Sequence, residues 1–178
     1  MDRQPHKTPF KTKAILTFAT LITFYLIQSF CLASQYKCTR VTDGDTITVV
    51  SSGQKHTIRL VGIDAPETSR KKYAPGQPFS QKSTKHLAGL VLDKYVDIVS
   101  YGEDRYGRTL GVVYVDGNNV NLEIVRAGLA EVYRGKPAPG FDNGPYENAE
   151  RDARKAGLGM WSLGDKYISP REWRKIKN

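Results

Sequence analysis

The sequence predicts an α+β fold, mainly β, in which several short strands form a small barrel of mixed connectivity closed by helices. Two observations carry this prediction. Short runs rich in β-branched residues are separated by turns of Gly, Asn and Asp, and helical spacing appears only between or after these runs. The chain has 178 residues, of which 39% are hydrophobic and 25% charged, which suits one globular domain with an N-terminal extension.

The first half of this domain reads as a hairpin followed by a helix. Residues 36–50 alternate and predict a strand interrupted at Asp43-Gly44. Residues 51–54 form a turn, and residues 56–63 return as the second arm of the hairpin. A polar, basic loop over residues 66–78 leads to helical spacing over residues 80–92.

The second half predicts two more strands and three helices. The strands cover residues 95–101 and 110–115, with a charged turn at 102–107 between them and a hairpin turn at Asp116-Gly117 after them. The first helix is short, capped by Asn121 and ended by Gly128. The second covers residues 145–156 after a Gly- and Pro-rich loop. The capping box of Ser169 and Glu172 begins the last helix.

Residues 1–33 have the pattern of an export signal. Four basic residues precede an uncharged apolar run, and Cys31-Leu32-Ala33 offers a small–x–small cleavage site. The alternative is an uncleaved membrane anchor, because the run is long enough to span a bilayer. Either interpretation predicts that the rest of the chain is exported, periplasmic or extracellular. The predicted organisation is a leader over 1–33, a domain over 36–163 and a C-terminal tail over 164–178.

The domain itself is basic. The chain carries 27 Lys and Arg against 18 Asp and Glu, and its first 33 residues hold only four of the bases and one of the acids, so residues 34–178 keep a net charge of +6. Such a protein attracts polyanions, either nucleic acid or an anionic membrane surface, although solubility alone also explains the charge. Only Cys38 remains outside the leader, which predicts a small buried hydrophobic residue rather than a disulfide or zinc site.

Four carboxylates lie within 25 positions of this basic chain: Asp43, Asp45, Asp64 and Glu67. An acidic cluster repels a polyanion unless a cation reverses the local sign. Because the segments that carry the acids contain no His or Cys, the ligands are oxygens, which favours calcium or magnesium over zinc or copper. The alternative is that Asp43-Gly44 is only a turn and that Asp64 only caps a loop.

Two arginines accompany the acids. Arg59 lies in an otherwise apolar strand, so it must pair either with a core carboxylate or, through its two parallel N–H groups, with a phosphate. Arg108 follows a tight Tyr-Gly turn and is a second candidate for a phosphate clamp that stabilises the charge of a phosphorane-like transition state. Glu67, directly after Pro66, is the carboxylate best placed to act as a general base for water.

At these residues the chain resembles the staphylococcal nuclease-like (thermonuclease) family. The matching segments are Asp43-Gly44-Asp45-Thr46, Arg59-Leu60 through Ile63-Asp64-Ala65-Pro66-Glu67, Asp104-Arg105-Tyr106-Gly107-Arg108, Asp116-Gly117, Val120-Asn121, Val125 to Ala130 and Gly157 to Trp161. The resemblance runs from about Cys38 to Trp161. It implies an OB-fold, a five-stranded Greek-key barrel with three helices, to which this chain adds the short C-terminal helix.

The resemblance also implies a calcium site. Asp45, Asp64 and the main-chain carbonyl of Ala65 are the implied ligands, with Thr46 beside the metal and Asp43 around it without direct contact. The best-known member has threonine where this chain has Ala65, and a carbonyl ligand tolerates that change.

The implied activity is hydrolysis of DNA and RNA by an enzyme that leaves 3′-phosphates. Glu67 is the implied base, and Arg59 and Arg108 are the implied phosphate clamp. The remaining expected substrate contacts are Arg105 and Tyr106 at a terminal phosphate, Tyr133 near a stacked base, and Lys71 in the basic loop. A monomer is sufficient for this function.

Two other hypotheses belong to different classes. A non-catalytic OB-fold module would bind single strands by charge and stacking, but this chain keeps both arginines, both metal aspartates and the glutamate. A membrane-anchored interaction protein would rest only on the long apolar run.

Overall fold

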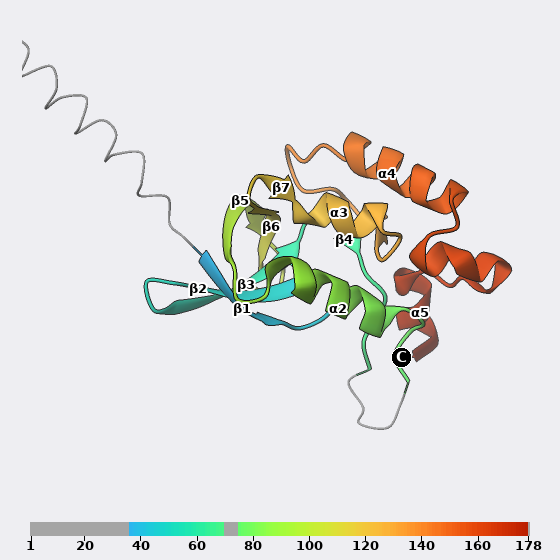
Figure 1. Ribbon diagram of the computed structural model, residues 1–178, viewed down its shortest axis with the longest axis horizontal. Coiled ribbons are helices and arrows are strands. Elements are labelled where there is room, and N and C mark those ends of the chain that lie inside the picture. The colour runs from blue at the N-terminus through green and yellow to red at the C-terminus, as the bar shows by residue number, and fades with distance from the viewer. Residues whose placement is uncertain (1–35, 70–74, 178) are drawn as a thin grey trace, which may run out of the picture. The chain divides into compact units, whose positions relative to one another are not determined.

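Five strands close into a barrel in the described residues, 36–69 and 75–177 of a computed structural model (Figure 1). The strands are β1 (Tyr36–Val41), β2 (Thr46–Ser51), β3 (Gln54–Leu60), β5 (Tyr95–Glu103) and β6 (Thr109–Val115). They run in the order β3-β2-β1-β5-β6 with antiparallel pairs, and a parallel pairing of β3 with β6 closes the sheet. The predicted α+β fold with a five-stranded OB-fold barrel is confirmed.

The predicted second arm of the hairpin is wrong at its end. β3 stops at Leu60, and Ile63 belongs to a separate strand, β4 (Ile63–Asp64), which pairs with β8 (Glu131–Val132). Gly62 lies between the two strands with φ of +80°, a conformation that glycine adopts freely and other residues rarely do. The turn at Gly62 therefore directs Asp64 out of the barrel wall toward β8.

Helices make up most of the remaining elements. They are α2 (Ser80–Val91), α3 (Val120–Arg126), which follows the two-residue strand β7 (Asn118–Asn119), α4 (Gly144–Lys155), the 3₁₀ segment η1 (Gly159–Lys166) and α5 (Pro170–Lys177). α3 packs between α2 and α4 (Figure 1). Leu87 and Val91 of α2 and Ile124 and Val125 of α3 are fully buried, which gives the barrel its apolar cover.

The predicted cap of α3 is wrong by two residues. Asn119 is the N-cap, because its side-chain oxygen accepts the Leu122 N–H at 3.0 Å. Asn121 is fully buried inside the helix, where it accepts the Val113 N–H and donates to the carbonyls of Val61 and Gly111, each at 3.0 Å. Asn121 thereby joins α3 to the barrel instead of starting the helix.

The capping box before α5 is confirmed. Ser169 Oγ accepts the Glu172 N–H at 3.2 Å, and the Glu172 carboxylate accepts both the hydroxyl and the N–H of Ser169. Pro170 begins the helix. α5 thus starts at a fixed point, and its orientation relative to the preceding chain is set by these bonds.

Cys38 lies in the core as predicted. Its side chain is fully buried among the residues of β1, β2 and α2, and burial raises the pKa of the thiol. The predicted leader over residues 1–33 lies outside the described residues. Within residues 36–69 and 75–177, no helix has the length and apolar character required to cross a membrane.

Candidate active site

Asp45, Arg59 and Asp64 form one ion-paired group at one end of the barrel. Asp45 immediately precedes β2, Arg59 lies opposite Thr46 on β3, and Asp64 ends β4. Arg59 Nη1 lies 3.0 Å from Asp45 Oδ2, and Arg59 Nη2 lies 3.3 Å from Asp64 Oδ1. Of the two partners predicted for Arg59, the structure contains the carboxylate pairing.

Other predicted neighbours of the cation surround Asp45. The Ala65 N–H donates to Asp45 Oδ2 at 2.9 Å, and the Thr46 hydroxyl donates to Oδ1 at 3.0 Å. Asp43 accepts the Asp45 N–H at 3.1 Å. The structure therefore brings residues 43, 45, 46, 64 and 65 close together.

Burial makes the charge on Asp45 costly. Burial, with a smaller contribution from Asp43, raises the pKa of Asp45 to about 6 against the opposing effect of Arg59. Glu131, which lies opposite Asp64 on β8, is also buried, and burial raises the pKa of its carboxyl in spite of a hydrogen bond from Tyr167. These acids create a strongly negative environment that an added cation would relieve.

Glu67 joins the group through an arginine that the sequence analysis missed. Arg174, on α5, places Nη1 at 2.5 Å from Glu67 Oε1 and 3.1 Å from Asp64 Oδ1, and places Nη2 at 2.8 Å from Asp64 Oδ2. The hydrogen bond to Asp64 raises the pKa of the Arg174 guanidinium. The capping box predicted the helix that carries Arg174, but no sequence pattern connected it with residues more than a hundred positions earlier.

Gln77, also missed, fixes the backbone of Glu67. Gln77 Oε1 accepts the Glu67 N–H at 3.0 Å, and the Gln77 N–H donates to the Glu67 carbonyl at 2.8 Å. The side-chain amide of Gln77 also donates to the Ile168 carbonyl at 2.7 Å. This buried glutamine thus holds the loop of Glu67 and the segment before α5 together.

The structure does not bring Arg108 into this group. Arg108 precedes β6, and Thr109, the next residue, pairs with Ile58 on β3. Its guanidinium binds Asp104, with Nε and Nη2 each 2.7 Å from Oδ2. Arg108 therefore lies two positions before Leu110, the residue that pairs with Arg59, but the Arg108 side chain binds within the β5–β6 turn.

The predicted substrate contacts lie on exposed surface. Tyr106 on the β5–β6 turn is 68% exposed and accepts a hydrogen bond from Arg105 at 2.7 Å. Tyr133 follows β8 and is also exposed, with its N–H bonded to the Gly62 carbonyl. Lys71 lies outside the described residues.

The donor set fits a hard divalent cation. In residues 36–69 and 75–177, no three side chains of His, Cys, Asp or Glu are grouped as ready metal ligands. Asp45 and Asp64 are instead held together by Arg59, next to the Ala65 peptide. The oxygen donors are two carboxylates next to a backbone peptide, a set that suits a hard cation such as calcium or magnesium. In this structure guanidinium groups supply the positive charge.

The family described as "Staphylococcal nuclease homologue" matches residues 57–163. The family match includes Arg59, Asp64, Glu67 and Arg108, and it begins after Asp43, Asp45 and Thr46. The chain belongs to the staphylococcal nuclease family. Membership identifies it as a nuclease, a hydrolase of phosphodiester bonds, and confirms the resemblance found in the sequence.

Relatives of this staphylococcal nuclease homologue match it over most of their length. An uncharacterized endonuclease of Haemophilus influenzae is 37% identical over 167 residues, covering 92% of this chain and 85% of the relative. An uncharacterized endonuclease of Escherichia coli is 40% identical, covering 83% and 89%. A protein named micrococcal nuclease from Shigella flexneri is 38% identical, covering 76% and 78%.

The family match does not reach the helix that carries Arg174. It ends at residue 163, whereas α5 covers Pro170–Lys177. The Arg174 contacts are therefore a feature of this staphylococcal nuclease homologue that its family match does not describe.

Proposed function

We propose that this protein is an exported, calcium-dependent nuclease that hydrolyses DNA and RNA and leaves 3′-phosphates. The observation that carries the proposal is the group of Asp45, Arg59, Asp64 and Glu67 at one end of the barrel in a basic member of the nuclease family. The names of its relatives, endonuclease and micrococcal nuclease, support the same substrate class.

Asp45, Asp64 and the carbonyl oxygen of Ala65 would hold the calcium ion. When bound, the ion supplies positive charge that neutralises a scissile phosphate. With the charge of the two aspartates compensated, Arg59 would no longer be needed to balance them. Its guanidinium would then be available for the phosphate oxygens.

Glu67 accepts a proton from the attacking water. The water oxygen forms a bond to phosphorus, the bond from phosphorus to the 5′-oxygen breaks, and the leaving 5′-oxygen takes up a proton. Arg59 and Arg108 donate hydrogen bonds to the phosphate oxygens as charge develops on them. For Arg108 this requires release from Asp104, which the phosphorane-like transition state favours because it carries more negative charge than a carboxylate.

The decisive experiment measures cleavage of denatured DNA by the purified protein with added calcium and with a chelator. We expect cleavage with calcium, none with the chelator, and product ends that a 3′-phosphatase converts to hydroxyls. Cleavage that resists the chelator would contradict the calcium assignment. Binding of DNA without cleavage in calcium would instead favour a non-catalytic binding module.

Substitutions test the roles of Glu67 and Arg108. We expect Glu67→Ala and Arg108→Ala each to lower kcat by about two to three orders of magnitude, the effect of removing one preorganised group that acts on the transition state. DNA binding should be largely retained in both variants. Arg126→Ala, at an exposed position of α3, is the control. Turnover near the wild-type rate in either active-site variant would show that its assigned role is wrong.

Export is tested separately from activity. We expect the protein in the periplasm or medium of producing cells, with an N-terminus close to residue 34 after cleavage of the leader. A membrane-bound product that keeps residues 1–33 would favour the anchor. A protein found only in the cytoplasm would overturn both forms of the proposal.

A further inference from the structure

Arg174 covers the two carboxylates that the proposed chemistry needs free. Its guanidinium spans both oxygens of Asp64 and one oxygen of Glu67, with separations of 2.5 to 3.1 Å. Asp64 is the proposed cation ligand and Glu67 is the proposed base. A single side chain from α5 thus engages both parts of the site at once.

The position of Arg174 is built into the fold. Gln77 bonds the Ile168 carbonyl with its side-chain amide, and the Tyr167 hydroxyl donates to Glu131 Oε2 at 2.6 Å. The capping box of Ser169 and Glu172 then sets the direction of α5. These contacts fix residues 167–169 and the first turn of α5. The Arg174 guanidinium therefore reaches Asp64 from an anchored helix and not from a free tail.

Burial differs sharply between the partners. The Asp64 side chain is 4% exposed, whereas those of Arg174 and Glu67 are 40% and 36% exposed. The acid cannot leave its place without disrupting β4 and β8, but the arginine lies at the mouth of the site and can turn into solvent by side-chain rotation alone. A divalent cation that binds Asp64 can therefore displace the Arg174 guanidinium.

We propose that Arg174 is a built-in competitor of the divalent cation, so that the C-terminal helix controls how readily the active site is loaded. This inference rests on the proposed calcium site. In the cation-free protein the guanidinium balances Asp64 and Glu67, and cation binding expels it. The Arg174 guanidinium and the cation cannot bind Asp64 at the same time. Removing the arginine therefore strengthens cation binding by the free energy of the lost ion pairs.

The test is calcium binding to the full-length protein without nucleic acid, measured by titration calorimetry. We expect Arg174→Gln to bind calcium about five- to tenfold more tightly than the wild type, the worth of a half-exposed, forked arginine–carboxylate contact. Arg171→Gln is the matched control, because it removes the same charge from an exposed position of the same helix. Arg174→Lys keeps the charge without the fork and should fall between wild type and Arg174→Gln.

The outcomes separate this inference from the proposed function. If the wild type binds calcium and Arg174→Gln binds it no more tightly than Arg171→Gln, Arg174 is not a competitor and the proposed nuclease mechanism stands. If neither wild type nor Arg174→Gln binds calcium, the calcium site itself is wrong and the inference falls with it. Circular dichroism of each variant confirms that the fold is retained, and Arg174→Lys provides a second variant if Arg174→Gln unfolds.

Discussion

Asp45 is a carboxylate that the fold places where its charge is unfavourable. It is buried, and burial raises its pKa to about 6. This holds even though Asp45 pairs with Arg59 and accepts hydrogen bonds from the Ala65 N–H and the Thr46 hydroxyl. A residue kept in such a position reduces the stability of the cation-free protein at neutral pH. The arrangement is consistent with a site that is completed by binding a cation.

The Asp45→Asn variant tests whether the buried charge of Asp45 lowers the free energy of unfolding. A carboxyl with its pKa raised from 3.8 to about 6 contributes stability that is fully present below about pH 3.8 and is lost as the pH rises through about 6. Asparagine has no such titration. With a chelator present, we therefore expect the free energy of unfolding of Asp45→Asn to gain about 2 kcal/mol relative to wild type between pH 4 and pH 7, measured by urea denaturation.

The control for this experiment is Asp97→Asn, at an exposed position of β5. Its stability should follow the wild-type curve across the same pH range. Parallel curves for Asp45→Asn and wild type would show that Asp45 is not the titrating group.

At this scale the sequence predicted the acids and Arg59, and it offered a carboxylate as one partner of Arg59, but it did not predict Arg174. A charged residue in an apolar strand requires a partner of opposite charge, so the position of Arg59 alone predicts such a partner. Arg174 carries no such signal, since arginines are common on a short polar helix. The partners of Arg174 depend on how α5 packs. Contacts between residues more than a hundred positions apart cannot be predicted from the local spacing of residues.

At the scale of elements, the loop that carries Asp43 and Asp45 is pressed against α2. A Cβ added to Gly44 would lie 2.0 Å from Ser83 Oγ and 2.7 Å from the Ala65 Cβ. Ser83 is fully buried, and Ala65 is the residue whose N–H bonds Asp45. Glycine at position 44 therefore lets the loop, the helix and the Ala65 peptide meet.

We expect Gly44→Ala to shift the loop, weaken the pairing of Asp45 with Arg59 and lower nuclease activity at least tenfold. The unfolding free energy should fall by about 1–3 kcal/mol, the usual cost of overpacking. Gly89→Ala in α2 is the control, because a Cβ there meets nothing within 4 Å and helix propensity favours alanine. Activity and melting temperature unchanged by Gly44→Ala would contradict the tight packing.

The predictable elements are those with a regular local pattern. The strands β1, β2, β5 and β6 and the helix α2 follow from periodicity and turn residues. The break between β3 and β4 does not, because Val61 and Gly62 extend an apolar run while Gly62 turns the chain. Asn121 was misassigned for a related reason: a polar residue near a helix start looks like a cap, and only the barrel shows that its amide bonds three backbone groups.

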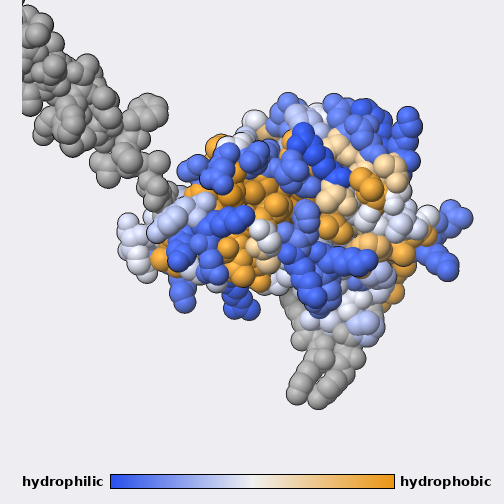
Figure 2. Space-filling model, viewed as in Figure 1, coloured by the Kyte–Doolittle hydropathy of each residue, from blue (hydrophilic) through white to orange (hydrophobic). Residues whose placement is uncertain are grey.

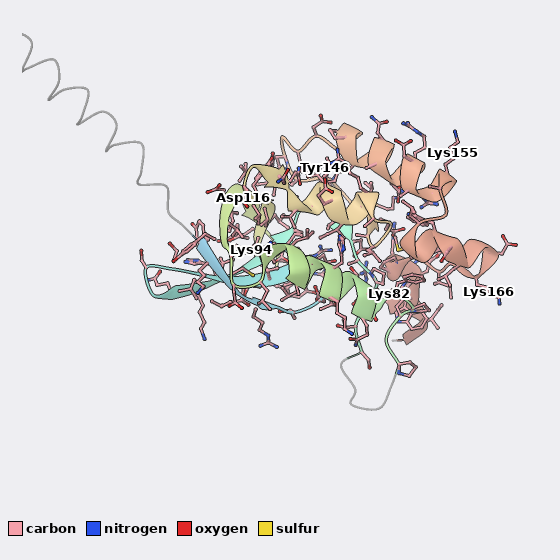
Figure 3. The ribbon with its side chains drawn as sticks, in the orientation of Figure 1. Lys82, Lys94, Asp116, Tyr146, Lys155 and Lys166 are labelled. Carbon is pink, nitrogen blue, oxygen red and sulfur yellow. The ribbon has the colours of Figure 1, made fainter. Side chains whose placement is uncertain are left out.

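At the scale of the whole molecule, exposed basic side chains contrast with the buried acids of the site. The labelled lysines Lys82, Lys94, Lys155 and Lys166 extend from the helices and the turn after α2 (Figure 3). On the face seen in Figure 2, hydrophilic residues gather over the helices and hydrophobic residues appear between them. A positive exterior attracts a polyanion, while the negative site requires a cation before a phosphate can enter.

Binding of single-stranded DNA should therefore depend on salt. With a chelator to prevent cleavage, we expect log K to fall against log salt with a slope of about −2, as for about three phosphate contacts. Arg105→Ala should make the slope shallower by about 0.7, because one contact is lost. Fluorescence anisotropy of a labelled oligonucleotide measures both values, and affinity independent of salt would exclude electrostatic capture.

The parallel pairing of β3 with β6 also sets when the enzyme becomes active during folding. It joins Ile58, Arg59 and Leu60 to Thr109, Leu110 and Gly111, so the two sides of the seam are separated by about fifty residues. Pairings between distant segments are delayed by loop-closure entropy. Since Arg59 lies in that seam and also holds Asp45 and Asp64, we expect recovered activity to follow this late step in refolding experiments. A nuclease whose chain is unfinished would be harmless to the nucleic acid of the cell that makes it.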